Sequence, residues 1–146
     1  MNFSSTNILI TGGAGYIGSH IVEQLVKTAA NIIIFDNLET GYKRLLNKKV
    51  KFIKGDIKNK KKISKTISDH KVDSIIHLAA YLNISEAETY KKKYYNNNIK
   101  GTLNLINACK KSKVKNIIFS SSCSIYGNVQ GAVDEKKKPN PKSYYA

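Results

Sequence analysis

A glycine-rich segment between a strand pattern and a helix pattern constrains the fold of this chain more than any other feature. The segment TGGAGYIGSH contains the spacing Gly13-x-Gly15-x-x-Gly18. It follows the apolar run NILIT, residues 7–11, and it opens a stretch of residues 15–27 that has apolar side chains at helical spacing. A strand, a tight glycine turn and a helix in this order predict a loop whose backbone can approach a phosphate group.

An acidic residue stands where a dinucleotide site needs one. Asp36 ends the next strand pattern, residues 31–36, at about the distance beyond Gly18 that such sites use. A carboxylate there accepts hydrogen bonds from the adenosine ribose and repels a 2′-phosphate, so the motif favours NAD over NADP. The alternative is a plain glycine turn with a capping aspartate. Asp56 ends the third strand pattern, where it could either cap the following helix or meet the adenine.

Strand and helix patterns alternate along most of the chain. Further strands are predicted at residues 49–56, 72–80 and 116–122, and helices at residues 58–68 and 85–112, the latter possibly broken. Strands that are continuously apolar are those buried on both faces, as in a parallel sheet covered by helices. The predicted fold is therefore α/β, a doubly wound parallel sheet of about five strands in the order 3-2-1-4-5, which forms one domain over residues 1–146.

Composition favours a soluble cytoplasmic protein. No apolar run approaches the length of a membrane span, and the N-terminal residues lack the features of a secretory signal. Cys109 and Cys123 form neither a disulfide framework nor a metal-ligand spacing. The net charge of +15 leaves nucleic acid as an alternative partner, but Arg44 is the only arginine, and specific readout favours arginine forks. We therefore expect neither specific nucleic-acid binding, nor membrane binding, nor a metal site.

Several segments together resemble the extended short-chain dehydrogenase/reductase family. They are ILITGGAGYIGSH, IFDNLETG, GDI, IIHLAA, YYNNNIKGTLNLINACKKSKVKNIIFSSSCSIYG and NPKSYYA, and they extend from Ile8 to the last residue. Within that family, the DNL and YYNNNIKGT segments are similar to those of nucleotide-sugar 4-epimerases.

The resemblance implies that NAD is the cofactor. The residues that it assigns to the cofactor site are Gly12, Gly15, Tyr16, Ile17, Gly18, Asp36, Asn37, Leu38, Asp56, Ile57, Leu78, Ala79, Ala80 and Asn98. One position departs from the pattern of some members, which have a lysine that contacts the cofactor where this chain has Leu82. This departure bears on the tightness of NAD binding rather than on the assignment.

The resemblance also implies the catalytic residues. It gives Tyr145 the role of the base that takes the proton of the sugar 4-hydroxyl, and Ser122 the role of a hydrogen-bonding partner and proton relay. Related dehydratases have Asp-Glu directly after the serine or threonine, whereas this chain has Cys123 and Ser124. Without the Asp-Glu pair for water elimination, the resemblance implies oxidation and re-reduction at C4 of the sugar. This reaction would interconvert UDP-glucose and UDP-galactose.

Two alternatives stay open: another UDP-sugar epimerase, such as one acting on UDP-glucuronate, and a non-catalytic NAD-binding regulator. The family's lysine would follow four residues after Tyr145, beyond the last residue. We therefore expect an inactive N-terminal fragment without its C-terminal substrate domain, and a homodimer for the full-length form. The fifth strand would be an unprotected edge, with Ile117, Ile118 and Phe119 as an aggregation risk.

Overall fold

The computed structural model describes residues 5–28 and 30–146. Residues 1–4, part of the stretch in which we expect no secretory signal, lie outside the described ranges. The elements in chain order are β1 (Asn7–Thr11), α1 (Tyr16–Leu25), β2 (Asn31–Asp36), a 3-10 helix (Lys43–Leu45), β3 (Lys51–Lys54), α2 (Lys60–Asp69), β4 (Ser74–His77), α3 (Ile84–Thr89), α4 (Lys91–Tyr94), a π-helix (Tyr95–Gly101), α5 (Thr102–Lys110), β5 (Asn116–Phe119) and a second 3-10 helix (Cys123–Tyr126).

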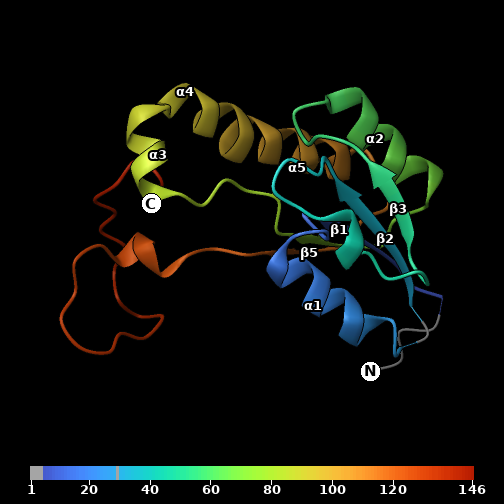
Figure 1. The fold of residues 1–146 in the computed structure, drawn as a ribbon, viewed down its shortest axis with the longest axis horizontal. Coiled ribbons are helices and arrows are strands. Elements are labelled where there is room, and N and C mark those ends of the chain that lie inside the picture. The colour runs from blue at the N-terminus through green and yellow to red at the C-terminus, as the bar shows by residue number, and fades with distance from the viewer. Residues whose placement is uncertain (1–4, 29) are drawn as a thin grey trace.

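The five strands form one parallel sheet in the order β3-β2-β1-β4-β5, which confirms the predicted topology. Helices α2 and α5 pack together on one face of the sheet, and α1 lies on the other (Figure 1). The strand order reverses direction at β1, between β2 and β4, so that the crevice typical of such sheets opens at the carboxyl end of β1.

Two apolar layers hold the helices to the sheet. Successive strand residues point to opposite faces, so Leu9 and Phe35 join the α2/α5 layer while Ile10 and Ile34 join the α1 layer. These four side chains have no exposed surface. Burial on both faces explains why the strands are continuously apolar rather than alternating.

The predicted helix over residues 85–112 is broken, as the sequence left possible. Helices α3 and α4 meet at Tyr90, and seven residues, Tyr95–Gly101, then form a π-helix before α5 begins. π-Helical turns occur mostly as local bulges inside α-helices, and these bulges are frequent at functional sites. The predicted strands 72–80 and 116–122 end earlier than expected, at His77 and Phe119, because the chain leaves the ladder to line the crevice.

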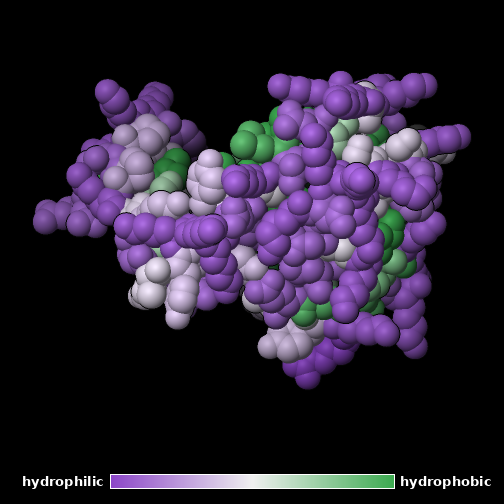
Figure 2. Space-filling view, turned by 90° about the horizontal axis from the view of Figure 1, so that it is seen from above, coloured by the Kyte–Doolittle hydropathy of each residue, from purple (hydrophilic) through white to green (hydrophobic). Residues whose placement is uncertain are grey.

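β5 is an edge strand, as predicted. Its apolar side chains are exposed, with Ile118 at 62% and Phe119 at 59%. The surface in Figure 2 is mostly hydrophilic and has only small hydrophobic areas, in keeping with the excess of lysine. Among the helices of the described ranges, none combines the length and the apolar character that crossing a bilayer requires.

Candidate active site

A cavity of about 1110 Å³ opens at the carboxyl edge of the sheet. Its walls bring together segments from all five strand ends, the π-helix and the last residues of the chain. The predicted site residues that line it are Gly12, Gly15, Tyr16, Ile17, Gly18, Asp36, Asn37, Asp56, Ile57, Leu78, Ala79, Ala80, Asn98, Ser122 and Tyr145. Leu38 does not line the cavity; its backbone amide donates to Asp36 Oδ1 at 2.8 Å.

The glycine loop lines this cavity, and its close packing leaves no room for side chains at Gly12 and Gly18. Gly12 has φ +74°, and a Cβ on it would lie 2.7 Å from the backbone nitrogen of Ala79. A Cβ on Gly18 would collide with the carbonyl oxygen of Gly12. Helix α1 starts directly after Gly15, so the first-turn amides and the positive end of the helix dipole face the cavity. The loop has the shape of a phosphate cradle.

Two hydrogen bonds fix the carboxylate of Asp36. Its Oδ2 accepts from the Ala14 amide at 3.0 Å and its Oδ1 from the Leu38 amide at 2.8 Å. Each carboxylate oxygen has a second acceptor position. The side chain is therefore tied to the glycine loop and can still accept hydrogen bonds from a ligand.

Asp56 does not cap the helix that follows it. The N-cap of α2 is Asn59, whose Oδ1 accepts from the Lys62 amide at 3.0 Å. Asp56 instead accepts from the Asn37 amide group at 3.1 Å and from the Lys58 backbone at 2.7 Å. Burial raises the pKa of Asp56, but these hydrogen bonds and the Lys58 ammonium outweigh it and hold the pKa below its usual range. Of the two roles left open, the structure thus excludes the helix cap.

Asn98 holds the segment after β4 in place. Its Oδ1 accepts from the Tyr81 amide and its Nδ2 donates to the Tyr81 carbonyl, both at 2.9 Å. The π-helix that contains Asn98 presents this side chain to the cavity. The amide of Asn98 therefore positions the backbone beside Ala79 and Ala80.

His77 is buried at the end of β4, between two hydroxyl groups. Its Nδ1 lies 2.6 Å from Thr11 Oγ1, and its Nε2 lies 2.9 Å from Thr102 Oγ1. The hydroxyl of Thr102 donates its single proton to the backbone carbonyl oxygen of Asn98, at 2.6 Å. Thr102 Oγ1 can therefore only accept from His77, so the proton of the imidazole lies on Nε2 and Nδ1 accepts from the Thr11 hydroxyl. Burial lowers the pKa of His77 to about 4. His77 is neutral with one defined tautomer.

Ser122 and Tyr145 both line the cavity, although 23 positions separate them in the sequence. Ser122 Oγ lies 2.8 Å from Ser124 Oγ and accepts from the Ser124 amide. Near Tyr145, the Ala146 amide donates to Ser143 Oγ at 3.1 Å, which is the bonding pattern of a helix N-cap. The neighbouring Tyr144 is more exposed, and its amide donates to Glu88 Oε1 at 2.6 Å.

Among the side chains of the cavity wall that the sequence analysis did not assign to the site, Tyr81 and Glu39 are joined by a short hydrogen bond. The Tyr81 hydroxyl donates to Glu39 Oε2 at 2.6 Å, and both residues line the cavity. Tyr81 follows the predicted strand 72–80, and Glu39 lies in the DNLETG segment that follows the predicted strand 31–36, so the sequence places each residue just beyond the end of a strand. The contact between Tyr81 and Glu39 could not be predicted from the sequence, because 42 positions separate the two residues.

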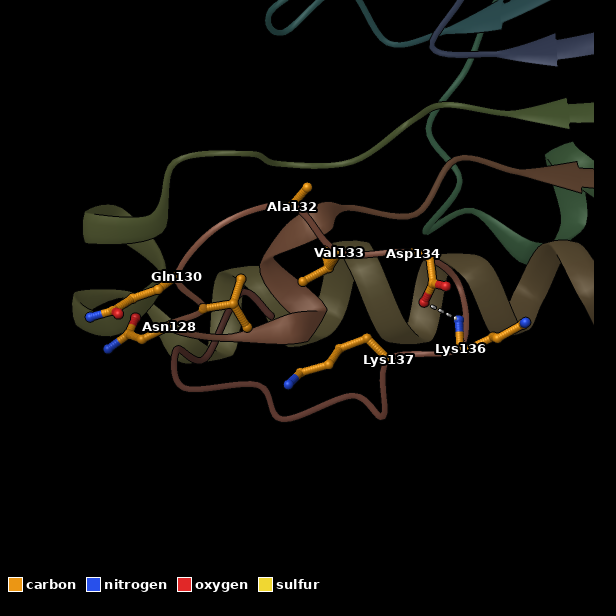
Figure 3. A pocket seen from close by; sticks show the side chains of 8 residues that line it. Asn128, Gln130, Ala132, Val133, Asp134, Lys136 and Lys137 are labelled. Atoms are coloured by element: carbon orange, nitrogen blue, oxygen red, sulfur yellow. Dashed lines mark hydrogen bonds between the residues drawn. The ribbon is translucent and has the colours of Figure 1, made fainter.

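A second hollow, of about 780 Å³, lies within the loop of residues 128–137 (Figure 3). It contains none of the predicted site residues, and in Figure 3 the side chains of Asn128 and Gln130 point away from the centre of the molecule. No group of histidine, cysteine, aspartate or glutamate side chains in the described ranges is arranged to hold a metal ion.

The sequence is similar to one family over nearly its whole length. The pattern of the "NAD dependent epimerase/dehydratase family" matches residues 8–146. UDP-glucose 4-epimerase of Lactobacillus helveticus is 42% identical over 120 residues, which is 82% of this chain and 36% of that protein. UDP-glucose 4-epimerase of Klebsiella pneumoniae is 39% identical over 128 residues, covering 83% of this chain and 92% of that sequence.

Solved structures show the same similarity. UDP-glucose 4-epimerase from Brucella ovis in complex with NAD has a TM-score of 0.91 at 34% identity, covering 97% of this chain and 43% of that one. The enzyme from Thermotoga maritima with UDP-glucose has a TM-score of 0.91 at 35% identity, covering 96% and 46%. The chain spans under half the length of these two structures, and about a third of the Lactobacillus protein. On this match of sequence pattern, fold and cavity, the chain belongs to the NAD dependent epimerase/dehydratase family.

Proposed function

We propose that this chain forms the NAD-binding part of an epimerase that interconverts UDP-glucose and UDP-galactose. The observation that carries the proposal is the single cavity that gathers the glycine loop, Asp36, Ser122 and Tyr145. Because the chain spans only about a third of the Lactobacillus helveticus protein and under half of the Brucella ovis structure, the activity is proposed for a protein of that greater length.

Three features of the cavity support the proposal that it binds a dinucleotide. Side chains are excluded at Gly12 and Gly18, where a pyrophosphate must come close to the backbone. The free acceptor positions of Asp36 suit ribose hydroxyls, and its charge opposes a 2′-phosphate. The small side chains of Ala79 and Ala80 leave room along the wall. NAD held by these residues would supply the hydride chemistry of the proposal, which is oxidation and re-reduction at C4 of the sugar.

Tyr145 and Ser122 supply the proton chemistry of this proposal. The Tyr145 phenolate takes the proton of the 4-hydroxyl during oxidation and returns it during reduction. Ser122 hydrogen-bonds the same sugar oxygen and can relay the proton. A nearby positive charge favours the deprotonated form of a tyrosine, so the proposal calls for such a charge close to Tyr145.

The test compares two neighbouring tyrosines in the full-length protein, meaning this sequence extended to the length of its relatives. Tyr145→Phe should lower the turnover of UDP-galactose by a factor on the order of 10² to 10⁴, the usual contribution of a general base. Tyr144→Phe is the matched control and should retain turnover. Undiminished turnover in Tyr145→Phe would refute the assignment of the base.

We also propose that the full-length protein is a cytoplasmic homodimer. Tyr95, Ile99 and Leu103 are spaced four apart along the π-helix and α5, and each is at least 42% exposed. Such a stripe is suited to pack against a second copy. Both cysteines are free, as thiols are in a reducing compartment. Leu103→Lys should shift the dimer to monomer in light scattering coupled to size exclusion, whereas an unchanged mass would refute this interface.

A further inference from the structure

Two loops meet across the carboxyl end of β1, where the glycine loop begins. Thr11, the last residue of β1, pairs in register with Phe35 on one side and with His77 on the other. Glu39 lies four positions beyond Phe35, and Tyr81 lies four positions beyond His77. Since β1 separates β2 from β4, the 2.6 Å hydrogen bond from Tyr81 to Glu39 spans the end of β1. We refer to this Tyr81–Glu39 pair as the rim bridge.

Both ends of the rim bridge are anchored in the walls of the cavity. On one side, Asn37 Nδ2 lies 3.4 Å from Glu39 Oε2 and 3.1 Å from Asp56 Oδ2. On the other side, the two hydrogen bonds from Asn98 hold the Tyr81 backbone. A continuous set of hydrogen bonds therefore connects the ends of β2 and β3 with the π-helix.

A lysine supports the bridge from the side. The Lys93 ammonium lies 4.4 Å from the centre of the Tyr81 ring and 4.0 Å from Glu39 Oε1. It is itself held by Glu86 Oε1 at 2.7 Å. The Lys58 ammonium lies 5.7 Å from the centre of the same Tyr81 ring. The contacts join a cation, an aromatic ring and a carboxylate, the last two of which line the cavity.

The phenol of Tyr81 is a stable donor. Burial, the hydrogen bond to Glu39, and the negative charges of Glu39, Asp56 and Glu86 together raise the pKa of Tyr81 far above its usual range. The hydroxyl of Tyr81 therefore keeps its proton near neutral pH and can donate it to the Glu39 side chain. A hydrogen bond to a charged acceptor is stronger than one between neutral groups.

We infer that the rim bridge retains the bound dinucleotide, because the Tyr81–Glu39 hydrogen bond spans the glycine loop and must break before the ligand enters or leaves. This inference rests on the proposed function for the identity of the ligand. Tyr81 is a positioning residue that touches no reacting atom. A bridge that is intact in both the free and the bound state slows association and release alike, whereas an ordinary ligand contact slows release alone.

The experiment measures both rates with NADH as the probe in the full-length protein. Nicotinamide fluorescence follows binding after mixing, and a chase with excess NAD follows release. Tyr81→Phe keeps the ring and removes the hydroxyl, and it should raise both rates about 5-fold with the Kd unchanged, as the partial exposure of the hydrogen bond implies. Glu39→Gln keeps an acceptor and should give a smaller increase. Tyr42→Phe is the matched control, because Tyr42 is 58% exposed and does not line the cavity.

A second measurement tests the bridge without any ligand. In the ligand-free protein, Tyr81→Phe should speed the amide hydrogen exchange of residues 37–41, because that loop loses its partner. Unchanged exchange together with unchanged rates would overturn the inference, as would a faster release with unaltered association. Failure of the wild-type protein to bind NADH would instead refute the proposed function, and the exchange measurement would still decide whether the bridge joins the two loops.

Discussion

The buried imidazole of His77 makes the stability of this protein depend on pH in a predictable direction. The pKa of His77 is lowered to about 4 by burial, whereas an exposed histidine has a pKa of 6.5. Between these two values the unfolded chain binds a proton at this residue and the folded chain does not. Stability therefore falls as the pH decreases from 6.5 to about 4, and this group causes no further loss below that.

The size of this loss of stability follows from the difference between the pKa of His77 in the folded and in the unfolded chain. Each pH unit within the window contributes about 1.4 kcal/mol, so the whole window contributes roughly 3 kcal/mol to the free energy of unfolding. His77 is only 3% exposed, and its two ring partners, Thr11 and Thr102, are uncharged, so solvent and neighbouring charges offset little of this. Such a loss is a large fraction of the stability of a typical domain.

The assay is urea unfolding at several pH values between 7 and 4.5, for the wild type and for His77→Gln. Other groups titrate in this window, but they are common to both proteins and cancel in the difference. The wild type should lose stability more steeply than His77→Gln, while the control His20→Gln, at an exposed site on α1, should behave as the wild type. Parallel stability curves for wild type and His77→Gln would refute the reasoning.

NMR of the wild type provides a direct check, since the His77 ring should carry its proton on Nε2 at pH 6.

Three further predictions concern the loop, a helix cap and the sheet edge. Gly12→Ala places a Cβ at φ +74° and 2.7 Å from the Ala79 backbone, so it should lower stability by at least about 2 kcal/mol and abolish NAD binding, as thermal unfolding and calorimetric titration would show. Asn59→Ala removes the side-chain cap of α2 and should cost about 1 kcal/mol in urea unfolding, and Asn59→Asp should restore most of it. Ile118→Lys places a charge on an edge strand at a side chain that is 62% exposed, so it should slow aggregation in light scattering with little change in melting temperature. An equal aggregation rate would show that β5 is not the associating edge.

Local sequence patterns predicted most of the fold, because the physical causes of each element lie close together in the chain. The run NILIT and the glycines after it place β1, the turn and α1 without any knowledge of distant residues. The ends of the later strands were less well predicted. Residues 78–80 and 120–122 directly continue two apolar runs and were predicted as strand, but they line the cavity instead of pairing along the sheet.

The π-helix shows a second limit of sequence patterns. Residues 95–101 fall within the predicted helical region 85–112, and a π-helix differs from an α-helix by one residue in its hydrogen-bond ring. Nothing local to YNNNIKG indicates that difference. The packing of Gly101 against Ile57, where a Cβ would lie 2.7 Å from the Ile57 side chain, belongs to the tertiary structure.

The sequence alone determined the class of fold, the strand order and the glycine loop, because these follow from local periodicity and from general rules of chain topology. Only the tertiary structure decided the tautomer of His77, the role of Asn98 as a clamp and the contact between Tyr81 and Glu39. Each of these depends on hydrogen bonds between residues 17 or more positions apart, whose distances are set when helices and strands pack against one another.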